Sequence, residues 1–163
     1  MWSSVGSAGV VDTADISKIV FIQSLAQLGV GGGVVLEPAS QTAVVTSPKV
    51  IARIRYPVQQ AELGNQNTGV WQLNVRLRDG DGDVLIELIR VIIATGDEHE
   101  IFTVEGGVGF NRSETFHNIK GLAEFALDFN ANVYYVVVTL SGVRNVLTLG
   151  TPPAVQLMQL DFA

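Results

Sequence analysis

Residues 69–94 constrain the fold more than any other part of the chain. In the first half of this stretch, apolar and polar side chains alternate strictly. The apolar set is Trp71, Leu73, Val75 and Leu77. A strand has a side-chain period of two, so the alternation predicts a β-strand with one dry face and one wet face. An Asp-Gly turn and an almost wholly apolar run, 84–93, follow, which predicts a β-hairpin in the middle of a sandwich.

Further strand-like runs follow one another along the chain, separated by Gly, Pro, Asn and Asp. The clearest runs are 48–56, 121–129, 133–140 and 154–162. We also predict one strand within 16–28 and short strands at 34–36, 42–46, 101–104 and 143–149. No segment of a dozen residues has a helical pattern. Eight to ten strands with turn signals between them predict an all-β fold, an antiparallel β-sandwich of jelly-roll type.

The domain organisation is expected to be simple, because 163 residues suit one domain. We predict an extended N-terminal arm, 1–15, and a single β-sandwich domain, 16–163. The arm is rich in small and polar residues, and Trp2, Val10 and Val11 would be its anchors on a neighbouring subunit. The alternative is a disordered terminus.

The composition excludes several classes of protein. Charged residues make up 16% of the chain and hydrophobic residues 47%, and the mean hydropathy is +0.33. No apolar run is long enough for a membrane helix, so a subunit interface is the expected place for the excess apolar surface. The net charge is -6 and the ten basic residues are scattered, which argues against nucleic-acid binding. The absence of cysteine excludes disulfides and thiolate chemistry.

Alternate aspartates in the turn of the predicted hairpin form a weak candidate calcium site. Asp79, Asp81 and Asp83 are interleaved with glycines, and hard cations prefer such oxygen ligands. An EF-hand loop would carry a glutamate further along, whereas this chain continues into the apolar run. The alternative is an ordinary solvent-exposed turn.

A second acidic cluster, Asp97, Glu98, His99 and Glu100, is predicted to be a charged surface turn, because neighbouring strand residues point in opposite directions. His117 is the one other histidine, which argues against a cupin-type metal site. The chain has no GxSxG or phosphate-loop motif. We therefore predict no catalytic residues and no cofactor, apart from the weak calcium candidate. A cupin-like enzyme remains a third alternative, which only the fold class supports.

Two stretches, GVWQLNVRLRDGDGDVLIEL at 69–88 and NVYYVVVTLSG at 132–142, resemble at class level the small jelly-roll proteins of bacteriophage particles, such as capsid decoration (cement) proteins and fibre or tail head domains. The second stretch is also similar to the late strands of trimeric C1q/TNF-like jelly rolls. This resemblance implies a homotrimer in the virion. The implied partner is the major capsid protein or another virion protein.

We therefore expect a non-enzymatic structural virion protein that oligomerises and binds the viral shell. The residues expected to make contacts are Trp2, Val10, Val11, Asn65, Gln66, Asn67 and Phe162. Tyr134 and Tyr135 are neighbours in a predicted strand, so whichever faces outward is a further interface candidate. The alternative function is a carbohydrate- or receptor-binding module, and calcium held by the aspartate turn would make its binding calcium-dependent.

Overall fold

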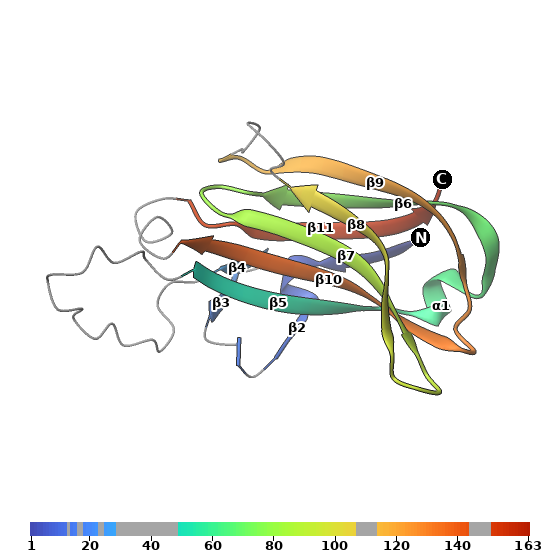
Figure 1. The fold of residues 1–163 in the computed structure, drawn as a ribbon. Helices are drawn as coiled ribbons and strands as arrows, with labels where there is room; N and C mark the ends of the chain where they lie inside the picture. Colours follow the sequence, from blue (N-terminus) through green and yellow to red (C-terminus); the bar gives the residue numbers. More distant parts are fainter. Residues whose placement is uncertain (13, 16–17, 23–24, 29–48, 107–113, 144–150) are drawn as a thin grey trace, which may run out of the picture.

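The computed structural model describes residues 1–12, 14–15, 18–22, 25–28, 49–106, 114–143 and 151–163, which form two antiparallel sheets packed face to face (Figure 1). Sheet A has the order β3 (Ile19–Ile22), β4 (Leu25–Leu28), β11 (Ala154–Phe162), β6 (Gln66–Arg78) and β9 (His117–Leu127). A further strand, β1 (Trp2–Val5), pairs with β11. Sheet B has the order β2 (Val10–Val11), β5 (Lys49–Val58), β10 (Asn132–Val143), β7 (Asp83–Ile92) and β8 (Glu98–Gly106).

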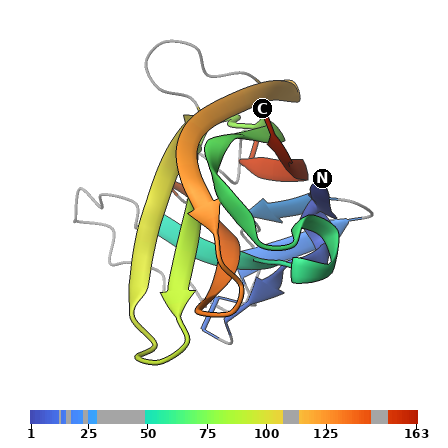
Figure 2. The ribbon, with the colours of Figure 1, turned by 90° about the vertical axis from the view of Figure 1, so that its right-hand side faces the viewer.

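The strand order is that of a jelly roll. Of the eight strands from β4 to β11, the order β4-β11-β6-β9 makes one sheet and the order β5-β10-β7-β8 makes the other. Figure 2 shows the two layers from the side, with β8 and β9 close together at one margin. The predicted antiparallel β-sandwich of jelly-roll type is confirmed.

The prediction of a β-hairpin at 69–94 is wrong. β6 and β7 are consecutive strands, but β6 pairs with β9 and β11 in sheet A, whereas β7 pairs with β8 and β10 in sheet B. The turn between them crosses from one sheet to the other. Each strand has an apolar face, and these faces are buried by stacking the strands across the sandwich instead of pairing them edge to edge.

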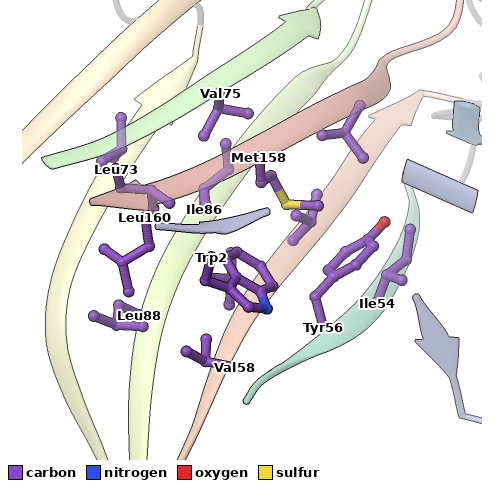
Figure 3. Close-up of a cluster of buried hydrophobic side chains, with 14 of the residues drawn as sticks. Trp2, Ile54, Tyr56, Val58, Leu73, Val75, Ile86, Leu88, Met158 and Leu160 are labelled. Atoms are coloured by element: carbon purple, nitrogen blue, oxygen red, sulfur yellow. The ribbon is translucent and has the colours of Figure 1, made fainter. Parts of the chain in front are cut away.

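The core lies between the sheets, as the alternation predicts. Figure 3 shows Leu73 and Val75 of β6 in one cluster with Ile86 and Leu88 of β7. All four side chains are at most 1% exposed. Burial of a side chain of this size contributes about 1.5–3 kcal/mol. The alternation therefore determines which face of each strand turns inward.

The predicted N-terminal arm is part of the sandwich. β1 pairs with β11, and Trp2 is 2% exposed within the core (Figure 3). Its Nε1 donates to the carbonyl oxygen of Pro57 on β5, 3.2 Å away, so this side chain joins sheet A to sheet B. The hydroxyl of Tyr56 donates to the carbonyl oxygen of Gly6 at 2.7 Å, in the short 3-10 helix Gly6–Ala8, and burial raises the pKa of this hydroxyl. The sandwich therefore begins at β1, not at residue 16.

The strand predicted within 16–28 is two strands, because β3 and β4 pair antiparallel with each other. The predicted strand 34–36, the strand 42–46 and all but the first residue of 143–149 lie outside the described residues. A short helix, α1 (Gln60–Leu63), precedes β6. No helix in the described part of the chain has the length and apolar character needed to cross a membrane.

Candidate functional site

The outer face of sheet B is unusually apolar at its centre. On β10, Tyr134, Val136 and Val138 point into the core, so Tyr135 and Val137 point outward. Val137 is only 2% exposed and Ile89 of β7 only 6%, although neither belongs to the core cluster between the sheets. These two side chains are buried on the outside of the sandwich, among their neighbours on that face.

The same face carries a groove of about 450 Å³, which we call the β10 groove. It is lined by residues from all five strands of sheet B and from the segment after β2: Val10, Asp12, Arg55, Pro57, Ile89, Val91, Glu98, Val133, Tyr135 and Val137. Most of the lining is apolar, and the charged groups belong to the flanking strands and the segment after β2. This combination is typical of binding surfaces, which join an apolar floor to a few polar groups.

The charges are divided between the two sides of the β10 groove. Val137 of β10 is opposite Arg55 of β5 on one side and opposite Glu87 of β7 on the other. A guanidinium nitrogen of Arg55 lies 3.8 Å from a carboxylate oxygen of Asp12, and both side chains are well exposed. Across this part of the sheet, the face is therefore basic on β5, where Asp12 partly neutralises Arg55, apolar on β10 and acidic on β7.

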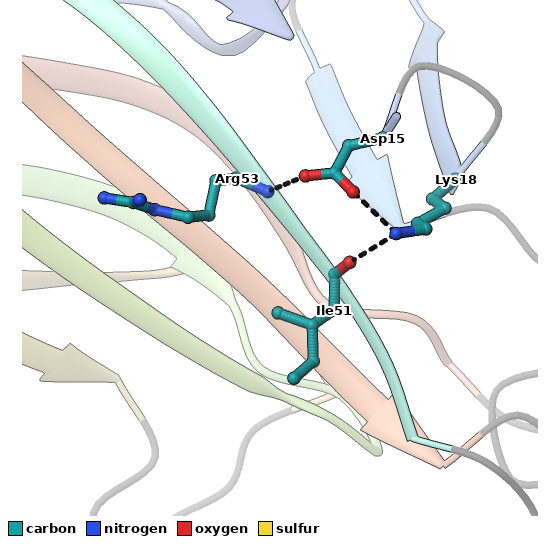
Figure 4. Close-up of polar contacts among 4 residues, drawn as sticks. All are labelled: Asp15, Lys18, Ile51 and Arg53. Atoms are coloured by element: carbon teal, nitrogen blue, oxygen red, sulfur yellow. Dashed lines mark hydrogen bonds and ion pairs between the residues drawn. The ribbon is translucent and has the colours of Figure 1, made fainter. Parts of the chain in front are cut away.

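Side chains block the free edge of β5 where β2 ends (Figure 4). The Asp15 carboxylate accepts from the backbone N–H of Arg53 at 3.2 Å and from Lys18 Nζ at 2.6 Å. Lys18 Nζ also donates to the carbonyl oxygen of Ile51 at 3.2 Å. Burial alone would raise the pKa of Asp15, but the hydrogen bonds and positive charges of Lys18 and Arg53 lower it below its usual value. An edge occupied in this way is a poor template for pairing with another strand.

The predicted contact residues do not form one surface. Val10 is 62% exposed and lines the β10 groove, whereas Val11 is half-buried and packs against the core. Trp2 cannot be a surface contact, because it is buried in the core of its own chain. Its indole is shielded from water within its own subunit, where β1 pairs with β11 and the Pro57 carbonyl oxygen accepts the indole hydrogen bond.

The remaining predicted contacts belong to β6, β11 and the residue before β6. Phe162 at the end of β11 is 55% exposed, and its ring packs edge-on against Trp71 at a centroid distance of 5.2 Å. Gln66 and Asn67 begin β6 and are exposed, as is Asn65. Asn65 Oδ1 accepts from the backbone N–H of Phe129 at 2.8 Å. The structure therefore shows Asn65 in an intramolecular role.

The three aspartates of the predicted calcium turn have different surroundings. Asp79 is fully buried, and its Oδ2 lies 3.5 Å from Nε2 of His117 on β9. Asp81 Oδ2 accepts from the backbone N–H of Thr151 at 2.7 Å, and the Asp81 N–H donates to the Thr151 carbonyl oxygen. Asp83 is half-buried at the start of β7. The expectation of a solvent-exposed turn is wrong for Asp79, because the turn packs against the segment before β11.

Within the described ranges, no three or more His, Cys, Asp or Glu side chains are grouped closely enough to hold a metal ion. The acidic cluster 97–100 is exposed, as predicted. Only Asp97 lies in the connection before β8, because Glu98, His99 and Glu100 are the first three residues of β8. The two histidines belong to different sheets, His99 to β8 and His117 to β9. The described residues therefore give no geometric support to the calcium site predicted at Asp79, Asp81 and Asp83.

Sequence reasoning missed the centre of the β10 groove, apart from Tyr135. Of the tyrosine pair, Tyr134 is 2% exposed and faces inward, so Tyr135 is the outward one. The signal for Ile89 and Val91 was the nearly all-apolar run of β7, which carries apolar side chains on both faces. An alternating strand exposes polar groups on its outer face, whereas a strand of this kind requires a cover on both sides.

No family model matches the chain, and no curated protein matches it in sequence. Solved structures with some likeness include a PA14 sugar-binding domain from an RTX adhesin, with 17% identity and a TM-score of 0.33, covering 70% of this chain and 46% of that one. A GH26-CBM35 β-(1,4)-mannanase of Podospora anserina has 14% identity and a TM-score of 0.42, covering 99% and 27%. A family GH115 4-O-methyl-α-glucuronidase has 10% identity and a TM-score of 0.37, covering 100% and 18%.

This chain thus spans less than half the length of each of these three proteins. At such identities and TM-scores, the likeness transfers neither ligand nor activity to this chain. The described residues and their geometry identify it as an antiparallel β-sandwich of jelly-roll order with a groove on the outer face of sheet B.

Proposed function

We propose that this chain is a non-enzymatic assembly module that binds a second copy of itself through the outer face of sheet B. The observation that supports this most is the largely apolar β10 groove, which all five strands of the sheet line and in which Val10 is 62% exposed and Val133 40% exposed. Val137 and Ile89 at the centre are already covered by their neighbours, so the stabilisation would come from removing the exposed apolar area of residues such as Val10 and Val133 from water.

The charge pattern favours a two-fold arrangement. A two-fold axis parallel to β10, in the plane between two facing copies, places the β5 side of one copy over the β7 side of the other. Arg55 and Glu87 flank the same residue, Val137, so each Arg55 then faces the Glu87 of the second copy. Tyr135 and Val137 meet their own counterparts on the axis. One rotation thus pairs opposite charges and buries the apolar centre.

The shielded edge of β5 also favours contact through the face. Asp15 and Lys18 occupy backbone groups of β5 that another strand would need for edge-to-edge pairing. A virion location and a capsid partner, which the class-level resemblance implies, remain expectations within this proposal. The proposed pair replaces the expected trimer, because two-fold symmetry brings the opposite charges together.

Charge reversal with sedimentation velocity tests this proposal. We expect a dimer for the unaltered chain, and weaker association by about tenfold or more for Arg55→Glu and for Glu87→Arg. The double variant should recover most of the affinity, since it restores the opposite charges in exchanged positions. If the single variants lost the dimer because they failed to fold, combining the two substitutions would not restore it.

A matched pair of substitutions controls for general effects of added charge. Val133→Glu alters a 40% exposed residue that lines the β10 groove and should abolish the dimer. Leu122→Glu alters a 56% exposed residue on β9 of sheet A and should leave the dimer intact. A monomer at all concentrations, a trimer, or equal effects of the two substitutions would contradict the proposal.

A second candidate function is a carbohydrate- or receptor-binding module that uses the β10 groove. Its volume of about 450 Å³ is within the usual range for small-ligand sites. Tyr135 lies among apolar residues with Arg55 and Glu98 nearby, and a sugar ring has a matching apolar face and hydroxyl edge. A monomer that binds a glycan, and loses that binding on Tyr135→Ala, would favour this function over assembly.

A further inference from the structure

The outer face of sheet A has a different chemical character from that of sheet B. The inward set of β6 is Trp71, Leu73, Val75 and Leu77, so the polar residues between them point outward. The neighbouring strands continue this polar surface. Asn74 lies opposite Gln159 of β11 and Lys120 of β9, and Arg76 lies opposite Asn118 of β9.

A groove of about 360 Å³ crosses this face, and we call it the β6 groove. It is lined by Asn74, Val75, Arg76, Asn118, Leu157 and Gln159. The lining therefore contains one cation, three carboxamides and no carboxylate. All of these residues belong to strands, so a ligand would meet groups that the sheet already holds in position.

Hydrogen bonds orient the polar groups of the β6 groove. Arg76 Nε donates to Gln156 Oε1 at 2.9 Å, which fixes the guanidinium plane and leaves its two terminal NH₂ groups as donors. Gln72 Nε2 donates to Asn74 Oδ1 at 2.8 Å, so Asn74 offers its amide nitrogen. The Arg76 guanidinium carbon lies over the ring of Phe116, 6.0 Å from the ring centroid, in a cation–π contact.

Arg76 is half-buried, and among the described residues no carboxylate lies within ion-pair distance of it. The acidic residue of β11, Asp161, lies opposite Gln72, which is four residues before Arg76 on β6. Its carboxylate lies 3.8 Å from the amino terminus and accepts from the backbone N–H of Phe162. A partly desolvated guanidinium whose two terminal NH₂ groups have no hydrogen-bond partner among the described residues can bind a carboxylate through two parallel hydrogen bonds.

We propose that the β6 groove binds a small polyhydroxy carboxylate, with Arg76 holding the carboxylate and with Asn74, Asn118 and Gln159 hydrogen-bonding the hydroxyl groups. Carboxamides both donate and accept, as hydroxyl groups do, so three of them suit a polyol. The net charge of -6 disfavours a long polyanion, whereas a single carboxylate meets mainly the local cation. This groove lies on the opposite sheet from the β10 groove, so the proposal does not depend on self-association.

Calorimetric titration with D-gluconate and D-glucitol tests the proposal, because the two compounds differ chiefly in the carboxylate. We expect gluconate to bind and glucitol to bind at least about tenfold more weakly. Arg76→Gln should lower the affinity for gluconate by about tenfold or more. Arg90→Gln, which removes the same charge from an exposed position on β7 of sheet B, should leave it unchanged.

A second measurement uses the unaltered chain, so it holds even if Arg76→Gln fails to fold. In NMR spectra, the side-chain NH₂ signals of Asn74, Asn118 and Gln159 should shift with gluconate and not with equal glucitol. Equal binding of both compounds, no effect of Arg76→Gln in a folded variant, or no shift of these signals would overturn the proposal. Sulfate that displaces gluconate with equal affinity would overturn it too, because the site would then be a simple anion contact.

Discussion

At the scale of single residues, Asp15 shows how one carboxylate connects the segment after β2 to strand β5 of sheet B. Its oxygens accept from Lys18 Nζ and from the backbone N–H of Arg53, on the edge of β5. These contacts favour the charged form and lower the pKa of Asp15 in the folded chain. The charged carboxylate therefore contributes more to folding than a neutral side chain of the same shape would.

We predict that Asp15→Asn lowers the free energy of unfolding by about 1–2 kcal/mol at pH 7, because one oxygen acceptor and the ion pair with Lys18 are lost. The folded pKa is below the unfolded value of about 3.9, so this stabilisation is fully present above about pH 5. It is lost as the pH falls through the folded pKa. Urea unfolding of both forms between pH 7 and pH 2 measures the difference, and a gap that stays constant with pH would contradict the assignment.

Gly80 is a second case in which one residue decides a local path. It has a φ of +57°, and a Cβ there would lie 2.1 Å from the carbonyl oxygen of Thr151. Only glycine both adopts this backbone conformation readily and permits so close an approach. The turn between β6 and β7 can therefore pass against the segment before β11 while the chain crosses from sheet A to sheet B.

At the scale of elements, β1 is a strand of its own subunit's sandwich and not an arm. It pairs with β11, while its Trp2 side chain reaches the backbone of β5 in the other sheet. This connection ties the first residues of the chain to both layers of the sandwich. The expectation of an arm came from small and polar residues in the sequence, which carry no information about the sheet they adjoin.

Trp2→Ala should lower the free energy of unfolding of the chain by about 3–5 kcal/mol, because it leaves a cavity between the sheets. Val5→Ala is the control in the same strand, where the side chain is 41% exposed and the expected loss is about 0.5 kcal/mol. Chemical denaturation of a monomeric form, such as the Arg55→Glu variant, separates folding from assembly. If Trp2→Ala changed only the oligomeric state and not this unfolding energy, an arm that serves a neighbour would be the better description.

At the scale of the whole molecule, the two outer faces have different properties. The face of sheet B has an apolar centre between basic and acidic sides, whereas the face of sheet A is rich in carboxamides around Arg76. Two copies that meet through sheet B would turn their sheet A faces outward. The proposed pair would then display two β6 grooves on opposite sides.

If the chain associates through sheet B, its unfolding temperature should rise with protein concentration, because dimerisation stabilises only the folded form. We expect a clear rise between micromolar and hundred-micromolar protein. Arg55→Glu should remove most of this dependence. Differential scanning calorimetry at several concentrations measures it, and a constant unfolding temperature for the unaltered chain would contradict self-association.

The sequence by itself determined most of the long strands and which of their faces turn inward, but not the short strands β1 to β4 near the N-terminus. The alternation in 69–78 and the runs 121–129, 133–140 and 154–162 are local patterns, and the period of two acts within each strand. The outward position of either Tyr134 or Tyr135 followed in the same way. These properties depend only on neighbouring residues, so the order of amino acids along the chain is enough to predict them.

Only the tertiary structure decided which strands pair, where Trp2 lies and which side chains share a groove. β6 and β7 are equally suited to pairing with each other and to stacking across the core, and the choice depends on strands that are distant in the sequence, such as β9, β10 and β11. Arg55, Val137 and Glu87 become neighbours only through the register of β5, β10 and β7. Register and sheet membership come from long-range packing, in which many distant contacts form together, so no local pattern contains them.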